Sequence, residues 1–137
     1  MLTLNRNKIK AFTLMEVMIV VAIVGILAAI AVPMYTEQVK KGKRNDAMQA
    51  LLAASEAVER YKAANFTYDS LDDLSTVFNT TVPTDGGTAY YTLSINTPSA
   101  TQYTITATAT GSMAGDGNLT INHAGQKTYK GNPGWPD

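Results

Sequence analysis

The chain has 137 residues, with 11 basic and 11 acidic side chains, one histidine and no cysteine. This composition cannot supply the Cys/His cluster that a transition metal requires, and the sequence also lacks a nucleophile elbow, a phosphate-cradling glycine-rich loop and a clustered acid–base pair. We therefore expect a protein that is not an enzyme and that has no catalytic residue, cofactor or metal site.

The first predicted element is an apolar run over residues 12–32. As a helix rising about 1.5 Å per residue, its roughly 21 residues cover about 31 Å, the thickness of a bilayer core. A basic segment precedes the run, as in a secretory signal, but the run is too long for such a signal and no small-residue cleavage site follows it at Pro33. We expect a retained membrane span, and the basic residues on both sides of it do not decide its orientation.

Glu16 is the one charged residue in the apolar run. A charge in hydrocarbon costs about 2.5–3.5 kcal/mol on insertion scales, so Glu16 either reaches the headgroups or is neutralised by a partner. Gly25 lies inside the run and Pro33 ends it, and both residue types disfavour a helix. By themselves they indicate close helix packing at Gly25 and a kink at Pro33.

Residues 34–64 have the pattern of an amphipathic helix. Apolar residues recur at spacings of four and three and form one stripe that can pack on a sheet: Ala47, Leu51, Ala54, Val58 and Tyr61.

A basic cluster over residues 40–44 lies in this predicted helix. It is either a solvated or headgroup-facing patch, or it pairs with acidic residues of a neighbouring subunit, for which Asp69, Asp72 and Asp73 are candidates. Nucleic-acid binding through the cluster has little support, because four charges are few and salt screens them.

The remaining sequence predicts a loop and then a sheet. Residues 65–89 mix Thr, Asp, Gly and Pro with scattered apolar side chains, and Ser70 is expected to cap a short helical turn there. Later segments alternate apolar and polar residues and predict an antiparallel meander, with residues 96–99 as one of its turns. The predicted strands are Tyr90–Ile95, Gln102–Ala109 and Asn118–Asn122, with a fourth short strand at Lys127–Tyr129.

Three features of this half of the chain have a binding and a structural interpretation. His123 lies in a predicted turn, where a turn role is favoured over catalysis or metal binding. Trp135 is expected to cover the sheet as an apolar plug rather than to serve as a ligand platform. The third feature is a set of carboxylates of the kind that binds calcium, without an EF-hand pattern: Asp69, Asp72, Asp73 and Asp85.

The segment Phe12-Thr13-Leu14-Met15-Glu16-Val17, after a short basic leader ending in a small residue, resembles a type IV prepilin with its class III N-methylated signal. The resemblance extends over nearly the whole chain. Further segments are similar to PilE-like pilins in the expected order: Arg44–Ala47, the Ala/Leu-rich stretch to Tyr61, Tyr90–Leu93 and Gly115–Ile121.

The resemblance implies that a prepilin peptidase cuts between Ala11 and Phe12 on the cytoplasmic side and N-methylates Phe12. The new amine of Phe12 would then pair with Glu16 of a neighbouring subunit, since a charge buried in apolar surroundings needs a complementary charge. The family further suggests that Gly25 to Pro33 loses helical structure in the filament. The family usually has glycine before the cut, so Ala11 is a departure that bears on the cleavage rate.

A second departure concerns the C-terminal region, which many members close with a disulfide. This chain has Asn118 where the first cysteine would be expected. We therefore expect packing and hydrogen bonds to hold that region, with a contribution from Trp135.

The expected fold is α+β: a pilin fold whose long N-terminal helix spans a membrane with its first half and packs its amphipathic second half on a three- to four-stranded antiparallel sheet. The expected segments are a cleaved leader (1–11), the transmembrane and filament-core helix (12–33), the amphipathic half (34–64), the αβ-loop (65–89), and the sheet with the C-terminal region (90–137).

The expected function is that of a structural subunit of a type IV pilus, supporting adhesion, twitching motility or DNA uptake. The subunit would be stored in the inner membrane with a cytoplasmic N-terminus and would then join an extracellular pilus. Its expected partners are other copies of itself, the prepilin peptidase, and the assembly platform with its ATPase. Two alternatives stay open: a minor pilin or type II secretion pseudopilin, and a monomeric single-span membrane protein with an external binding domain.

Overall fold

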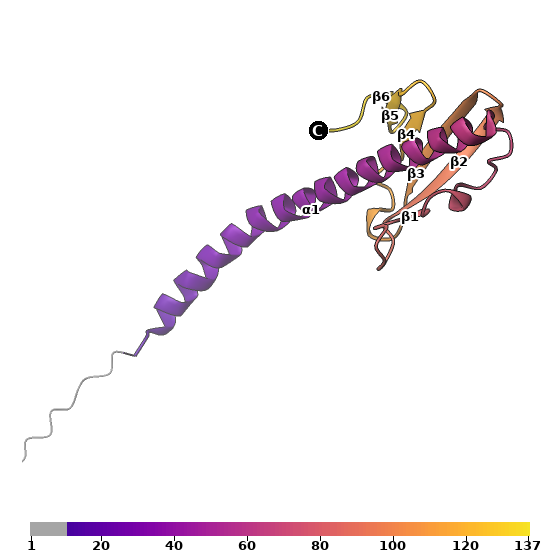
Figure 1. The fold of residues 1–137 in the computed structure, drawn as a ribbon. Coiled ribbons are helices and arrows are strands. Elements are labelled where there is room, and N and C mark those ends of the chain that lie inside the picture. Colours follow the sequence, from indigo (N-terminus) through magenta and orange to yellow (C-terminus); the bar gives the residue numbers. More distant parts are fainter. Residues whose placement is uncertain (1–10) are drawn as a thin grey trace, which may run out of the picture. The chain divides into compact units, whose positions relative to one another are not determined.

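The structure is a computed structural model that describes residues 11–137. In this range one long helix precedes two short 3-10 helices and six strands (Figure 1). The chain divides into two compact units, one ending at Gln38 and the other running from Val39 to Asp137, and helix α1 (Leu14–Asn65) contributes to both. Most of the expected leader, residues 1–10, lies outside the described residues.

In the first unit, α1 is continuous through Gly25 and Pro33. Proline has no backbone N–H to donate, so a carbonyl one turn earlier loses its helical partner. The hydroxyl of Thr36 shares its hydrogen bond between the carbonyl oxygens of Val32 and Pro33, at 2.9 Å each, in the turn after the proline. The expected loss of helix between Gly25 and Pro33 concerns the assembled filament and stays a prediction.

In the second unit, the amphipathic part of α1 buries one stripe. The predicted stripe is confirmed from Ala47 to Val58, and Tyr61 is half-buried. The helix ends at Asn65, one residue later than predicted, and the backbone N–H of Phe66 donates to the carbonyl of Lys62 at 2.6 Å. The buried residues of the helix are Ala47, Ala50, Leu51, Ala54, Ala57 and Val58.

The sheet is an antiparallel meander in which each strand pairs with the next one along the chain. Six strands are present rather than the expected three or four. The two additional strands, β1 and β6, have two residues each, which is too short to show an alternating pattern. The strands are β1 (Thr81–Val82), β2 (Tyr91–Ser99), β3 (Gln102–Ala109), β4 (Leu119–Asn122), β5 (Lys127–Tyr129) and β6 (Asn132–Pro133).

The predicted turn over residues 96–99 is wrong, because β2 continues to Ser99. Its partner β3 pairs Thr104 with Asn96 and Gln102 with Ser99, with an irregularity in register between these pairs. Pro98 and its polar neighbours gave this stretch the composition of a turn, but the hairpin reverses only after Ser99. The irregularity accommodates the proline in the strand, as a bulge does.

The core lies between the stripe of α1 and one face of the sheet (Figure 1). Alternate residues of the strands point into it, as the period of two requires. In β2 these are Tyr91 and Leu93, and the ring of Tyr103 in β3 meets that of Tyr68 edge to face at 4.9 Å between centroids. The described C-terminal segment contributes Trp135, which is partly buried against this core, as predicted.

The loop between α1 and β1 contains the 3-10 helix η1 (Leu74–Thr76). Its cap is Asp73, whose carboxylate accepts a hydrogen bond from the backbone N–H of Ser75 at 2.8 Å, so the prediction that Ser70 is the cap is wrong. The helical turn begins later than expected because Leu71 and Leu74 are both buried, and this places Asp73 at the cap position. A second 3-10 helix, η2 (Gly111–Met113), follows β3.

Candidate functional site

The start of α1 is closed by a capping box. The backbone N–H of Glu16 donates to Thr13 Oγ1 at 3.1 Å, and the backbone N–H of Thr13 donates to Glu16 Oε2 at 3.5 Å. A threonine before the helix and a glutamate three residues later satisfy two N–H groups that the helix leaves without partners. The capping role of Glu16 is not among the predictions from the sequence, although Thr13-Leu14-Met15-Glu16 has the Thr-x-x-Glu pattern of a capping box.

The capping box holds the Glu16 carboxylate at the helix start, beside the expected cleavage point. Ala11, Phe12 and Glu16 are all exposed, and the side chain of Phe12 is 77% accessible. The longer of the two hydrogen bonds, 3.5 Å, is weak, so the carboxylate keeps acceptor capacity for a further partner. The three residues predicted to act in processing and pairing are thus adjacent.

The first unit exposes a long apolar surface. Its helix is long and apolar enough to cross a membrane, and its apolar side chains are accessible from Phe12 to Tyr35. A helix that is apolar on all sides is stable in lipid or among similar helices, and such a large apolar area in water would associate. The accessibility of Gly25 and Pro33 on this surface leaves room for close contacts with a neighbouring helix.

The second unit contains a buried ion pair between α1 and the turn before β4. Arg44 Nε and Nη2 donate to Asp116 Oδ2 and Oδ1, at 2.6 Å each. The hydroxyl of Tyr91 donates to Asp116 Oδ2 at 3.2 Å, and the hydroxyl of Tyr129 donates to the Asp116 backbone carbonyl at 2.8 Å. We call these four residues the Asp116 clamp.

Electrostatics within the clamp follows from burial and charge. The hydrogen bonds from Arg44 hold the pKa of the Asp116 carboxyl below its usual value, although burial acts in the opposite direction. Burial, and then the charge of Asp116, raises the pKa of Tyr91 well above its ordinary value, so this hydroxyl stays protonated and donates. The clamp is therefore a satisfied network of a cation, an anion and two phenols.

Two stretches of the sequence match known families. Residues 33–120 match the family described as "Type IV minor pilin ComP, DNA uptake sequence receptor", and residues 6–32 match the "Prokaryotic N-terminal methylation motif". The chain belongs to the type IV pilin family. The resemblance expected from the motif at Phe12 is thereby confirmed, as is the α+β fold of one long helix on an antiparallel sheet.

The pilin is similar to subunits of two kinds of assembly. Fimbrial protein Q of Moraxella bovis is 39% identical over 93 residues, 61% of this chain and 54% of that protein. Fimbrial protein EcpB of Eikenella corrodens is 50% identical over 52 residues, 38% of this chain and 33% of that protein. Type II secretion system core protein G of Pseudomonas aeruginosa is 39% identical over 67 residues, 49% of this chain and 47% of that protein.

The matched regions cover about a third to a half of the length of these relatives. Fimbrial proteins and type II secretion core proteins are both represented. The family and the apolar helix together indicate a subunit that is anchored in a membrane and then enters a pilus-type filament.

In this pilin Asp116, the central residue of the clamp, lies in the C-terminal region, where many family members are expected to have a disulfide. Asn118, at the position expected for a cysteine, accepts a hydrogen bond from the backbone N–H of Ala109 through its side chain at 3.2 Å. The indole N–H of Trp135 donates to the carbonyl of Thr120 at 2.9 Å. Packing and hydrogen bonds hold this region, as the absence of cysteine led us to expect.

The clamp also revises the interpretation of the basic cluster. Arg44 is committed to Asp116, and Lys43 Nζ donates to Ser112 Oγ at 2.7 Å. The interpretation as a solvated patch is therefore wrong for Arg44, whose side chain is largely buried in the head formed by residues 39–137. Lys43 makes its hydrogen bond at the exposed surface and does not contradict that interpretation. Pairing of the cluster with Asp72 or its acidic neighbours in another subunit stays a prediction.

A second basic surface lies on the C-terminal strands of the pilin. Lys127 Nζ is 4.7 Å from the centroid of the Trp135 ring, and Lys130 Nζ is 5.1 Å from that of Tyr129. Cations over aromatic faces are attracted by the ring quadrupole. These two contacts between a lysine and an aromatic ring are not predicted from the sequence, because the four residues belong to three different local elements.

His123 takes part in a turn in the structure. His123 lies in the turn after β4, where its backbone N–H donates to the Tyr103 carbonyl at 3.1 Å. Among residues 11–137, no three His, Cys, Asp or Glu side chains are grouped so that they could hold a metal ion.

Proposed function

We propose that this pilin is a structural, non-catalytic subunit of a type IV pilus. The observation that carries the proposal is the apolar surface of α1 up to Tyr35, accessible throughout and interrupted by the single carboxylate of Glu16 near its start. The monomer is stored in the inner membrane with its N-terminus in the cytoplasm. Other copies of the helix then replace the lipid around it when an assembly platform and its ATPase add the subunit to the filament.

In this proposal the prepilin peptidase cuts between Ala11 and Phe12 and methylates the new amine of Phe12. The exposed carboxylate of Glu16 then receives the amine of the next subunit as that subunit's helix slides alongside. A charge left unpaired in an apolar bundle is costly, so the pair opposes packing at any other axial position. Glu16 thus sets the register of neighbouring helices more than it adds net stability.

Mass spectrometry of sheared surface filaments tests the proposal. We expect filaments made of chains that begin at N-methylated Phe12, and the precursor beginning at Met1 should accumulate in membranes of cells without the peptidase. A chain that keeps Met1 and stays in the membrane fraction of normal cells would overturn the proposal in favour of a monomeric anchor. Filaments restricted to an induced secretion system would favour the pseudopilin alternative.

A second candidate function, reception of DNA, is favoured by the family that the head matches. That family is described as a DNA uptake sequence receptor. In this chain, Lys127 and Lys130 offer phosphate-binding charges beside the rings of Trp135 and Tyr129. The surface proposed for DNA is thus on β5 and the C-terminal segment rather than on the basic cluster of α1.

Fluorescence anisotropy of labelled duplex DNA with the full chain in detergent micelles tests this role. We expect the double variant K127Q/K130Q to weaken binding and to reduce the slope of log affinity against log salt by about 2, because two phosphate contacts are lost. The matched control is Arg60→Gln, which removes an exposed charge at the end of α1. Equal weakening by the control, or an unchanged slope, would contradict a specific DNA surface on β5.

A further inference from the structure

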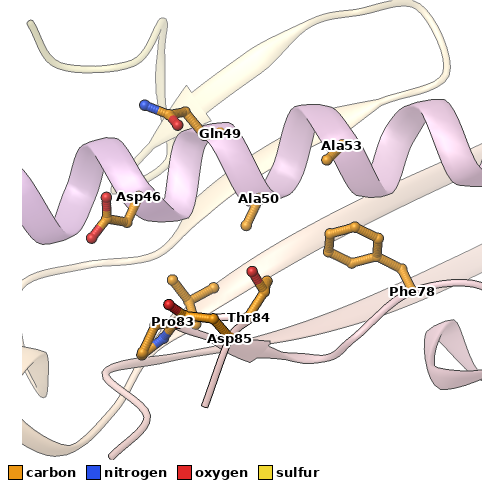
Figure 2. A pocket seen from close by; sticks show the side chains of 9 residues that line it. Asp46, Gln49, Ala50, Ala53, Phe78, Pro83, Thr84 and Asp85 are labelled. Atoms are coloured by element: carbon orange, nitrogen blue, oxygen red, sulfur yellow. The ribbon is translucent and has the colours of Figure 1, made fainter. Parts of the chain in front are cut away.

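A groove lies between the second part of α1 and the segment around β1 (Figure 2). It has a volume of about 490 Å³, within the range of ligand and side-chain pockets. Its lining is mixed: Ala50, Phe78 and Val82 supply an apolar part, polar side chains supply nearly half of the surface, and two carboxylates are among them. We call it the α1–β1 groove, and its lining residues include Asp46, Ala50, Phe78, Val82, Pro83 and Asp85.

The two carboxylates of the α1–β1 groove are accessible and close to one phenol. Asp46 Oδ2 accepts a hydrogen bond from the hydroxyl of Tyr90 at 2.6 Å. Asp85 is exposed on the opposite side of the groove from α1, as Figure 2 shows. The groove therefore combines an apolar part with negative charge, which favours an occupant that combines an apolar side chain with a nearby cation.

Phe66 is an exposed aromatic residue whose local structure does not explain its identity. Its side chain is 88% accessible, and its φ of 62° lies in the left-handed region just after the last residue of α1. Glycine is the usual residue at this position because it has no Cβ to clash, so phenylalanine there costs backbone strain. Neither burial in its own head nor the turn geometry requires an aromatic ring at Phe66.

The surroundings of Phe66 match the chemistry of the groove. Lys62 lies one turn earlier on α1, with its Nζ 4.5 Å from the centroid of the Tyr68 ring. A large apolar side chain, one helical turn from a cation, faces the solvent at one end of the head. A pocket with an apolar part and two carboxylates lies toward the other end of the same helix segment.

We propose that Phe66 of one pilin docks in the α1–β1 groove of a second copy, with Lys62 directed toward Asp85. The inference rests on the proposed polymerisation of the subunit. Groove residues Asp46 to Ala53 precede Phe66 by 13 to 20 residues, which corresponds to about 20–30 Å along a helix. The two surfaces differ, so the contact is heterologous and can repeat from copy to copy, as a filament requires.

Disulfide trapping in assembled filaments tests the contact directly, because the chain has no cysteine of its own. In the double variant F66C/T84C, oxidation of sheared filaments should give a ladder of covalent dimers, trimers and longer species. The two positions are too far apart for a bridge within one chain, since a disulfide needs Cα atoms within about 7 Å. The control pair F66C/A124C places the second thiol on the turn after β4 and should stay monomeric.

Filaments of F66C/T84C that stay monomeric on oxidation would overturn the docking contact and leave the pilus function intact. A lack of filaments in the unmodified protein would instead contradict the pilus function itself. If the double variant does not assemble, p-benzoylphenylalanine in place of Phe66 keeps an aromatic ring and can be photocrosslinked in filaments. Crosslinks that map to residues 46–53 or 78–85 of another copy support the proposal, and crosslinks to any other site or protein overturn it.

Phe66→Gly separates docking from folding. Glycine suits the left-handed backbone, so the thermal stability of the full chain should be unchanged or higher. Removal of the ring should nevertheless reduce the yield of sheared filaments by about tenfold or more, the scale expected for losing one buried aromatic contact. Phe66→Tyr is the control that keeps the ring, and equal yields from the glycine and tyrosine variants would contradict the proposal.

Discussion

The guanidinium of Arg44 and the carboxylate of Asp116 form a two-point ion pair, with both N–O distances at 2.6 Å, although 72 positions separate them in the sequence. The Arg44 side chain is 14% accessible and that of Asp116 is 5% accessible. The pair joins α1 to the turn before β4, and the phenols of Tyr91 and Tyr129 join β2 and β5 to the same residue. In a chain without cysteine, one buried aspartate thus connects the helix with three parts of the sheet region.

Arg44→Met tests the contribution of this pair to stability. The variant leaves the buried charge of Asp116 without its cation, and loss of one partner of a buried pair costs about 3–5 kcal/mol. We expect a decrease of this size in the free energy of unfolding, measured by denaturant titration of the full chain in micelles. Lys41→Met, at an exposed position of the same helix, is the control and should change stability by less than about 0.5 kcal/mol.

Replacement of both Arg44 and Asp116 shows why Arg44→Met is unstable. The cause is either the loss of the attraction between the two side chains or the buried charge that remains on Asp116. In R44M/D116L no charge remains in the site, and apolar side chains of similar size can pack there. We expect the double variant to recover a large part of the stability that Arg44→Met loses. A double variant as unstable as the sum of both single variants would show that the clamp acts through its hydrogen-bond geometry instead.

The pH dependence of stability should report the same carboxylate. Hydrogen bonds from Arg44 lower the pKa of folded Asp116 below the value of an unfolded aspartate, about 3.9. The stabilisation from this group is therefore fully present above about pH 4 and is lost as the pH falls through the lower pKa of the folded state. Thermal melting between about pH 2 and pH 7 should show this acid loss for the unmodified chain, and the loss should be smaller in Asp116→Asn.

Gly117 is the residue after Asp116 in the sequence. Its substitution tests how tightly the turn before β4 is packed. Its φ is 108°, and a Cβ at this position would overlap the side chain of Lys130. Gly86 has nearly the same φ, 109°, but a Cβ there would meet no atom within 4 Å. Gly117→Ala should therefore lower the free energy of unfolding by about 1 kcal/mol more than Gly86→Ala, since both variants have the backbone cost and only one forces Lys130 to move. Equal losses in the two variants would show that Lys130 moves away freely.

The large elements were predictable because their signals are periodic and local. The spacing of Ala47, Leu51, Ala54 and Val58 marks a helical stripe, and alternation marks β3 and β4 within one residue of their observed bounds. Composition misled the prediction at Pro98, where pairing with β3 extends the strand. Strands β1 and β6 could not be predicted, since two residues contain no period.

The contacts that define the candidate sites follow a different rule. Arg44 and Asp116 are in contact only because the fold brings them together. No periodic pattern in the sequence predicts which two charged residues will pair. The α1–β1 groove, which Phe78 lines, and the exposure of the Phe66 ring likewise depend on tertiary structure. The capping box of Thr13 and Glu16 is the exception, because its residues are three positions apart and the pattern can be read directly from the sequence.

Glu16→Gln separates the two roles that this residue can have at the start of α1. Glutamine also serves at the third position of a capping box, so it can keep the hydrogen bond to the Thr13 N–H while removing the charge. If pairing with the amine of a neighbouring subunit is the role of Glu16, the variant should stay in the membrane and should be cleaved, but its filament yield should fall severely. The same loss is expected for Glu16→Val.

Thr13→Val is the matched control for the Glu16 variants. It removes the hydroxyl that caps the helix, at a cost of about 1 kcal/mol, and leaves the Glu16 charge in place. We expect filaments from Thr13→Val at a yield much closer to that of the unmodified chain, measured by shearing, gel densitometry and electron microscopy. Normal filaments from Glu16→Gln together with few from Thr13→Val would mean that Glu16 acts through the cap and that its charge does not set the register.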